Sequence, residues 1–352
     1  MTVKNQDIKF LFKKMLFPIA FIFPFVFSMG VCSEIGAARA CIATVILSLF
    51  IDEFNSKSMI PVLLNFAVIS FIYSVFGETA TILSLIVSGI VLCFGYKLNN
   101  ILSKFKDSSI AIGIIIATAL VVTVLQTTNY FGIGATGNTA REMIQSYVSL
   151  GFHGNWRGVL YGTIVMVIMI TFPRKFKKLN KTVHASALEL LLTLVLNYFL
   201  NPSDMITSIN EVKSLDFEFG SDFNISAWGI VFSILCGIIT GLSNTVLLSK
   251  DECSNKDYVT TGIVNVLLSP FFCFIPQKIN KSFVKNIPVA LTTALIIFLI
   301  KDLIIRMPVH SCAVVLIVGA WQAIEWKKLK YAFNNPLTVI SFIIPIIIFL
   351  IF

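Results

Sequence analysis

Side chains that usually carry catalysis or hold metals are few in this sequence, and their spacing is unfavourable. It contains seven cysteines without a CxxC pair, and only three histidines that could join them in a site. Because zinc sites and disulfide frameworks need such residues in groups, we expect neither a metal site nor a disulfide framework. No cofactor is expected either. No Ser/His/Asp set and no paired carboxylates can be assembled on one side, which argues against an intramembrane enzyme.

Two prolines stand among small or polar residues at the beginning of apolar segments, in 56–61 and in 276–282. A helix that is broken inside a membrane offers unpaired N–H groups and the positive end of its dipole to a substrate. These two segments are therefore candidate binding elements. The alternative is that Pro61 only starts a helix and that 276–286 form a basic loop.

Long apolar segments carry these residues. Of the 352 residues 57% are hydrophobic and only 13% are charged, with a mean hydropathy of +0.89. Since a soluble protein of this length needs a polar surface, the composition excludes one and predicts an all-α polytopic membrane protein. About thirteen spans are expected, near 15–32, 38–51, 59–76, 80–96, 109–129, 156–172, 183–200, 226–248, 258–275, 279–288, 289–305, 309–324 and 336–352.

The net charge of +9 reflects the orientation of these spans rather than nucleic-acid binding. Basic residues in 97–106, 174–181 and 327–330 fall on the same side as the N-terminus, whereas the opposite loop is acidic. The positive-inside rule, applied to these loops, divides the chain into four predicted parts. They are a cytoplasmic N-terminus (1–14), a first transmembrane repeat (15–200), an acidic external loop (201–225) and a second, shortened repeat (226–352). Because the first repeat has seven spans, the second would be inverted, as in many secondary transporters.

Two acidic residues lie inside or beside the predicted spans. Glu189 is about two turns into the seventh span, where an ionisable residue is a functional candidate. Its alternative role is a structural pair with His184 or Lys181. Glu34, near an external turn, is interpreted as a local ion pair with Arg39.

Several segments resemble the sulfate permease (SulP) family of inorganic anion transporters. In 308–330 a proline-led apolar span runs into an acidic/Trp turn and a basic amphipathic helix, as in that family. Residues 254–265 resemble the beginning of its ninth span, with Asp257 in the position of a Glu. Lys281 and Ser282 resemble an Arg-Ser pair at the start of its tenth helix. Pro24 and Pro61 stand near family prolines, and the likeness covers nearly the whole chain.

The resemblance implies an inverted seven-span repeat fold, with a core domain that carries the substrate and a gate domain that mediates homodimers. The anion would lie between the N-termini of the third and tenth half-helices, with Lys281 as its counter-charge. Thr240 is similar to a hydroxyl of the family's coupling site, although this chain lacks the carboxylate of cation-coupled members there. The substrate-binding residues implied are Phe25, Ser28, Pro61, Val62, Asn280, Lys281 and Ser282; the coupling or structural candidates are Thr240, Asp257 and Glu189.

The sequence also departs from the family. Lys281 lacks the planar fork of the usual Arg, and Phe25 replaces a Gln. A fourteenth span and a cytosolic regulatory (STAS) domain are expected to be missing. The abundance of Phe, Ile, Lys and Asn is typical of an AT-rich bacterium, which would place the protein in the inner membrane.

We therefore expect a secondary transporter of sulfate, bicarbonate or chloride that works by alternating access. One alternative is a nucleobase permease, which shares the fold but binds its base through carboxylates that this chain lacks in the eighth and tenth spans. The other is a degenerate homologue that serves as a structural or regulatory subunit.

Overall fold

A computed structural model describes residues 14–32, 36–51, 56–102, 109–133, 140–151, 154–180, 183–200, 225–248, 253–272, 283–324, 326, 334 and 336–351. Within these ranges the chain is helical and forms no strand. This confirms the predicted all-α fold, because in lipid a helix satisfies every backbone hydrogen bond internally. The elements are η1 (Pro18–Ile22), α2 (Phe23–Cys32), α3 (Ala37–Phe50), α4 (Ser56–Leu102), α5 (Ser109–Phe131), α6 (Ala140–Leu150), α7 (Trp156–Lys175), α8 (Lys177–Asn180), α9 (Ala185–Leu200), α11 (Ala227–Leu248), α12 (Asn255–Leu268), η4 (Ser269–Phe271), α13 (Phe283–Leu299), α14 (Lys301–Ile304), α15 (Val309–Gln322) and α17 (Pro336–Ile351).

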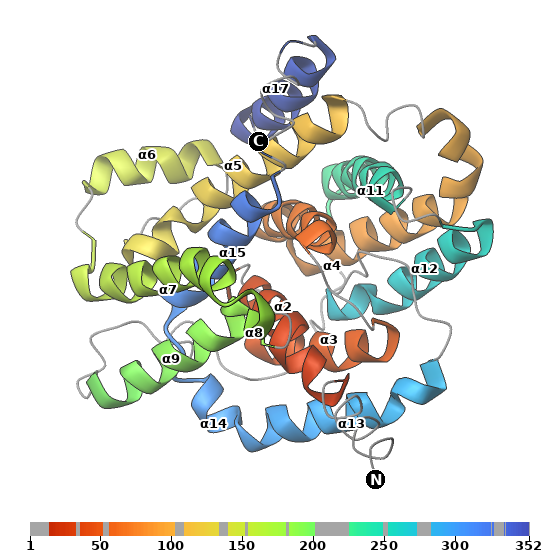
Figure 1. The fold of residues 1–352 in the computed structure, drawn as a ribbon. Coiled ribbons are helices and arrows are strands. Elements are labelled where there is room, and N and C mark those ends of the chain that lie inside the picture. The colour runs from red at the N-terminus through yellow and green to blue at the C-terminus, as the bar shows by residue number, and fades with distance from the viewer. Residues whose placement is uncertain are drawn as a thin grey trace.

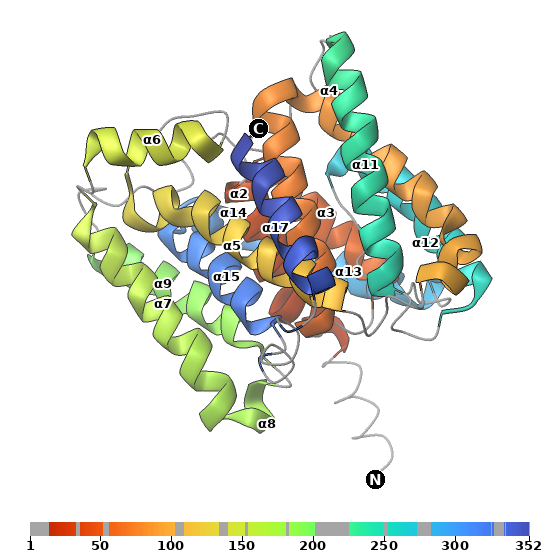
Figure 2. The ribbon, with the colours of Figure 1, turned by 90° about the horizontal axis from the view of Figure 1, so that it is seen from above.

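In the assembly shown in Figures 1 and 2, α4 packs against α11 and α12, α5 packs against α15 and α17, and α2 packs against both α3 and α15. For reference we group α2, α3, α4, α11, α12 and α13 as the α4 bundle, and α5, α7, α9, α15 and α17 as the α5 bundle; α2 and α15 are in contact across the two groups. Each bundle contains helices from both sides of the predicted acidic loop. The two halves of the sequence are therefore interleaved in space.

Helix α4 contains two straight helices that meet at Gly77. The backbone there has φ 81° and ψ −171°, which only glycine adopts readily. The second part of α4 packs closely against α11 and α12, because glycines let the backbones approach: a Cβ on Gly237 would lie 2.6 Å from Ser84 O, and one on Gly262 would lie 2.6 Å from Gly89 O.

Helix α15 is the central helix of the molecule, between α5, α7 and α2 (Figure 1). Its residues from Cys312 to Leu316 have no exposed surface. Near its end Trp321 Nε1 donates to Thr123 Oγ1 (2.9 Å) and Gln322 Nε2 donates to Met169 O (2.9 Å), which fixes α15 against α5 and α7.

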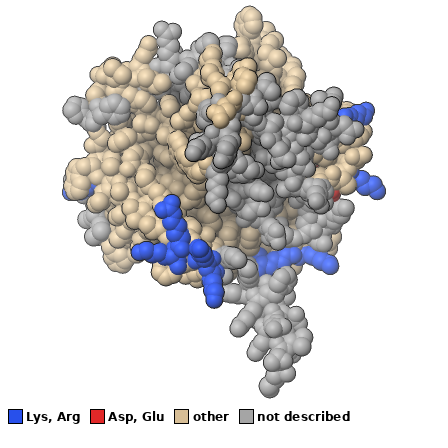
Figure 3. Space-filling view, turned by 45° about the horizontal axis from the view of Figure 1, so that its top comes forward, with Lys and Arg blue, Asp and Glu red and all other residues tan. Residues whose placement is uncertain are grey.

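Outward-facing side chains are largely apolar, as lipid requires. Val167 on α7, Leu191 on α9, Ile239 on α11 and Leu291 on α13 are all exposed. In Figure 3 Lys and Arg side chains stand out against a mostly uncharged surface. Exposed basic residues lie at the end of α7, Arg174 and Lys175, and at the start of α8, Lys177 and Lys178.

Four helices of the described residues are long and apolar enough to cross a membrane by length and composition, namely Lys14–Cys32, Val75–Leu98, Trp156–Lys175 and Ala227–Val246. Together with the shorter apolar helices, they make this chain a multi-pass membrane protein. One predicted pair of spans differs: instead of separate segments at 279–288 and 289–305, the structure has the single helix α13. Pro288 is only its sixth residue, so the proline breaks few helical hydrogen bonds.

Candidate functional site

Helix α2 places Phe25 and Ser28 in the interior, where they are 1% and 0% exposed. The Phe25 ring meets the His184 ring edge-on, with 5.7 Å between centroids. His184 precedes α9, and its Nδ1 accepts from the Ser186 amide (3.3 Å), so that it caps that helix. The predicted binding residues of the first span therefore lie next to the beginning of α9.

The third span begins in the predicted segment 56–61, three residues before the predicted bound of 59. Helix α4 starts at Ser56, and its backbone is helical through Pro61 and Val62. Since only the first four amides of a helix have no helical acceptor, the amide of Val62, the seventh described residue of α4, is not one of the unpaired N–H groups. The side chains of Pro61 and Val62 lie outside the described residues, so their contact with a substrate stays a prediction.

The predicted tenth half-helix, with Asn280, Lys281 and Ser282, also lies outside the described residues. The structure does describe its two flanks. Upstream, Phe272 contacts the Tyr73 ring (6.0 Å between centroids). Downstream, Asn286 Nδ2 donates to Leu49 O (3.1 Å), at the end of α3.

Two of the coupling candidates have structural partners. Thr240 Oγ1 donates to Cys236 O (2.6 Å) within its own helix. The Asp257 carboxylate accepts from Ser254 N and from Ser254 Oγ (2.8 Å each), which forms a capping box at the start of α12. The carboxylate of Asp257 therefore stabilises the beginning of α12.

Glu189 has a completely buried carboxyl group, and neither of its oxygens has a hydrogen-bond partner among the described residues. The suggested pair with His184 does not form, and Lys181 lies outside the described residues. The carboxyl group of Glu189 lies near the Cys312 thiol of α15. Cys312 in turn faces the hydroxyl of Ser28. Glu189 thus lies near the predicted substrate residues of α2.

A buried amide pair joins the third span to the eighth, and the sequence analysis missed it. Asn65 Nδ2 donates to Asn244 Oδ1 (3.3 Å), and the reverse contact is 3.4 Å. Both side chains are buried, at 1% and 3% exposure. Asn65 is one turn after Pro61, so this pair fixes the third span against α11 close to the predicted anion site. The signal available in the sequence was an Asn within each of two apolar segments.

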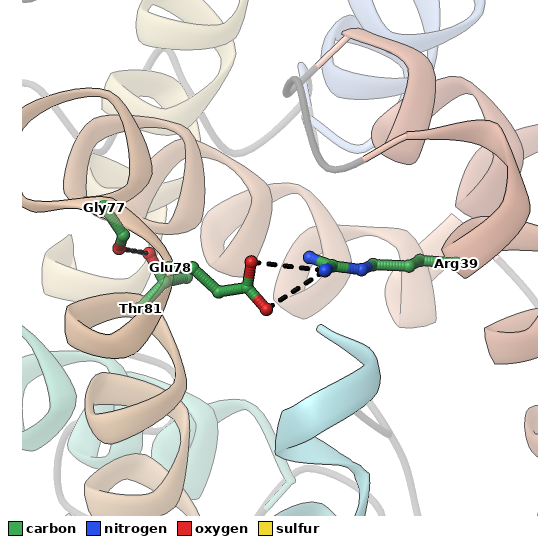
Figure 4. Close-up of polar contacts among 4 residues, drawn as sticks. All are labelled: Arg39, Gly77, Glu78 and Thr81. Carbon is green, nitrogen blue, oxygen red and sulfur yellow. Dashed lines mark hydrogen bonds and ion pairs between the residues drawn. The ribbon is translucent and has the colours of Figure 1, made fainter. Parts of the chain in front are cut away.

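Sequence analysis also missed the true partner of Arg39. Arg39 Nη2 contacts both carboxylate oxygens of Glu78, at 3.0 and 3.2 Å (Figure 4). The guanidinium also lies over the Phe272 ring, 5.0 Å from its centroid. The predicted pairing with Glu34 stays a prediction, because Glu34 lies outside the described residues; the partner that the structure does describe is Glu78, just after the Gly77 break. This contact ties α3 and the kink of α4 to the end of the η4 segment.

Metal-ligand clusters do not occur in the described part of the chain, where no three His, Cys, Asp or Glu residues could hold a metal ion. The cysteines described there are free thiols. The chemistry that the described interior offers is therefore hydrogen bonding by Ser and Asn side chains and proton exchange at Glu189.

Comparison with known proteins supports a transporter fold. No protein-family model matches this chain, and no curated protein does. Among solved structures it is similar to the transmembrane domain of BicA, a cyanobacterium bicarbonate transporter, with 17% identity, a TM-score of 0.69 and 95% of each chain covered.

A second similar protein is SLC26A9. One structure of it shares 12% identity at a TM-score of 0.54 and covers 91% of this chain and 59% of the other. The murine anion transporter Slc26a9 in its inward-facing state also shares 12% identity, with a TM-score of 0.61 and coverage of 95% and 64%. This chain thus has the transmembrane fold of the SulP/SLC26 anion transporters, the family that its sequence resembles.

Proposed function

We propose that this chain is a SulP-type secondary transporter of small inorganic anions, with sulfate, bicarbonate and chloride as the candidate substrates. The observation that carries this proposal is the likeness to BicA, which extends over 95% of both chains. In the proposed cycle the α4 bundle carries the anion and moves against the α5 bundle. The protein would lie in the bacterial inner membrane as a homodimer, with its N-terminus in the cytoplasm.

The proposed anion site combines the beginning of α4 with the segment before α13. The first amides of α4 offer N–H donors and the positive end of a helix dipole. Lys281 would supply the counter-charge, with Asn280 and Ser282 as further donors. Because removing an inorganic anion from water is costly, several such donors and a cation are needed to offset the loss. Phe25 and Ser28 would complete the site from α2.

The test is uptake of labelled sulfate, bicarbonate, chloride and uracil into proteoliposomes that contain the purified protein. Saturable uptake of an anion by the wild type, abolished in Lys281→Ala, is the expected result. Lys178→Ala is a matched control, since this exposed lysine lies on α8 and its removal should leave uptake unchanged.

Two outcomes would contradict the proposal. Uptake of uracil alone would favour a nucleobase permease. Correctly folded protein that takes up none of these solutes would favour a non-transporting subunit. Equal losses in Lys281→Ala and Lys178→Ala would mean that Lys281 acts through general surface charge rather than as a counter-charge.

A further inference from the structure

Glu189 carries a carboxyl group that the proposed anion site does not use. Its side chain has no exposed surface, and both oxygens lack a hydrogen-bond donor among the described residues. An ionised carboxylate in such a place would cost several kcal/mol, because the side chain is removed from bulk solvent and no donor among the described residues replaces its hydration. In this conformation the group is therefore held as a neutral carboxylic acid, that is, with a proton bound.

The position of Glu189 connects it to both bundles. Helix α9 belongs to the α5 bundle and packs against α7, α15, α2 and η1. Glu189 faces Cys312 at the first turns of α15, and Cys312 faces Ser28 on α2. Ser28 is one turn after Phe25, so the carboxyl group lies where the α5 bundle meets the predicted anion residues of the α4 bundle.

The other ionisable groups on these elements leave Glu189 without a counter-charge. On α15 they are Cys312 and His310, whose ring packs against Gly132 and Gly158. On α2 the group is the buried thiol of Cys32, which interacts with Cys312. On α7 they are Tyr161, Arg157, Arg174 and Lys175; η1 has none, and His184 before α9 is occupied by Ser186. Of these groups, Cys312 lies near Glu189.

We propose that Glu189 is a proton-binding site through which anion transport by this chain is coupled to proton movement in the same direction. This inference rests on the proposed function. When the two bundles move apart, water reaches the carboxylate and a proton binds to one of its oxygens; when they close, the neutral group is buried again. A negative charge at Glu189 would repel an anion held nearby, so proton and anion bind together, and each raises the affinity for the other.

The experiment compares two kinds of transport in the same proteoliposomes, with the membrane potential held at zero. Exchange of labelled sulfate, or of labelled chloride, is measured at equal pH on both sides. Accumulation of the same anion is then measured under an inward proton gradient of about one pH unit, which can raise accumulation up to about tenfold per coupled proton. The variants are Glu189→Gln, which resembles the protonated side chain, and Glu189→Asp, which can still bind a proton. Thr193→Val is the control, one turn along the same buried face.

Wild type, Thr193→Val and, more weakly, Glu189→Asp should accumulate anion under the gradient. Glu189→Gln should keep exchange but lose the gradient response. The inference is overturned if Glu189→Gln accumulates anion like the wild type, or if the wild type exchanges anions without any response to the gradient. Absence of exchange in the wild type would instead contradict the proposed function, and the inference would fail with it.

A second measurement needs no variant and remains valid if Glu189→Gln does not fold. A pH-sensitive dye inside weakly buffered vesicles reports protons that enter with the anion. Acidification on addition of sulfate or chloride to wild-type vesicles is expected, and anion entry without acidification would overturn the inference.

Discussion

At the scale of single residues, the ion pair between Arg39 and Glu78 shows how helix packing, and not spacing along the sequence, determines which acidic residue pairs with a buried arginine. The sequence indicated that Arg39 needs an acidic partner near a membrane surface, but the nearest one along the chain was Glu34. The structure selects Glu78, which is 39 positions away, because the Gly77 break brings the start of the second α4 helix beside α3. A partner chosen by helix packing cannot be found from local spacing.

Removing one member of this pair should be costly. Arg39 is buried and Glu78 is 23% exposed, so Glu78→Ala leaves a buried cation without its carboxylate. We expect a loss of about 3 kcal/mol of stability, measured as a lower melting temperature in detergent. The double variant Arg39→Met/Glu78→Ala should recover part of that loss. If the double variant is as unstable as the sum of the single ones, the two side chains do not interact.

At the scale of elements, hydropathy predicted the helices well but not where they begin and end. An apolar run must be helical in lipid, so twelve of the thirteen predicted spans have a counterpart among the described helices. The start of α4 at Ser56 falls in the predicted segment 56–61, whereas α13 continues through Pro288, where two separate spans were predicted. A proline near the beginning of a helix removes few hydrogen bonds, and tertiary packing decides whether it ends the helix.

The contact between α4 and α12 gives a prediction at this scale. An added methyl on Gly262 would contact Cys93 Sγ and lie 2.6 Å from Gly89 O and 2.7 Å from Cys93 N. Alanine normally favours a helix over glycine, but here it should cost about 2 kcal/mol through overpacking. Melting temperatures of Gly262→Ala and of Thr260→Ala, an exposed site on the same helix, provide the comparison. A Gly262→Ala protein as stable as Thr260→Ala would show that the helices separate without strain.

At the scale of the whole molecule, the odd number of spans before the acidic loop predicted an inverted second half, and this inversion stays a prediction; the structure shows that helices from both sides of the loop pack together. The sequence could not give the exact anion site, because the proposed residues come from helices far apart in the chain and part of them lies outside the described residues. Phe25 and Ser28 are in the interior as predicted, but their role as substrate ligands is still a prediction. Glu189 was recognisable from its place in an apolar span; its lack of a partner was not.

Sidedness is a property of the whole molecule that chemical labelling can test. Helix α7 has 20 residues, which is about 30 Å and enough to cross the hydrocarbon. Ser149 on α6 and Lys178 on α8 are exposed at its opposite ends. A membrane-impermeant maleimide added to intact cells should therefore label Ser149→Cys but not Lys178→Cys, and both in permeabilised cells. Labelling of both in intact cells would contradict the orientation.

The interleaving of the halves has a consequence for how the protein is made. The glycine-lined face of α4 is complete at residue 102, whereas its partner α11 ends at 248, roughly 150 residues later. At about 5–20 residues per second, the ribosome needs about 7–30 seconds to synthesise the missing helix. During that delay the polar backbone and small side chains on this face must be shielded by the insertion machinery or by provisional neighbours. Slower translation through 103–248 would extend this interval and increase the chance that α4 is recognised as misassembled.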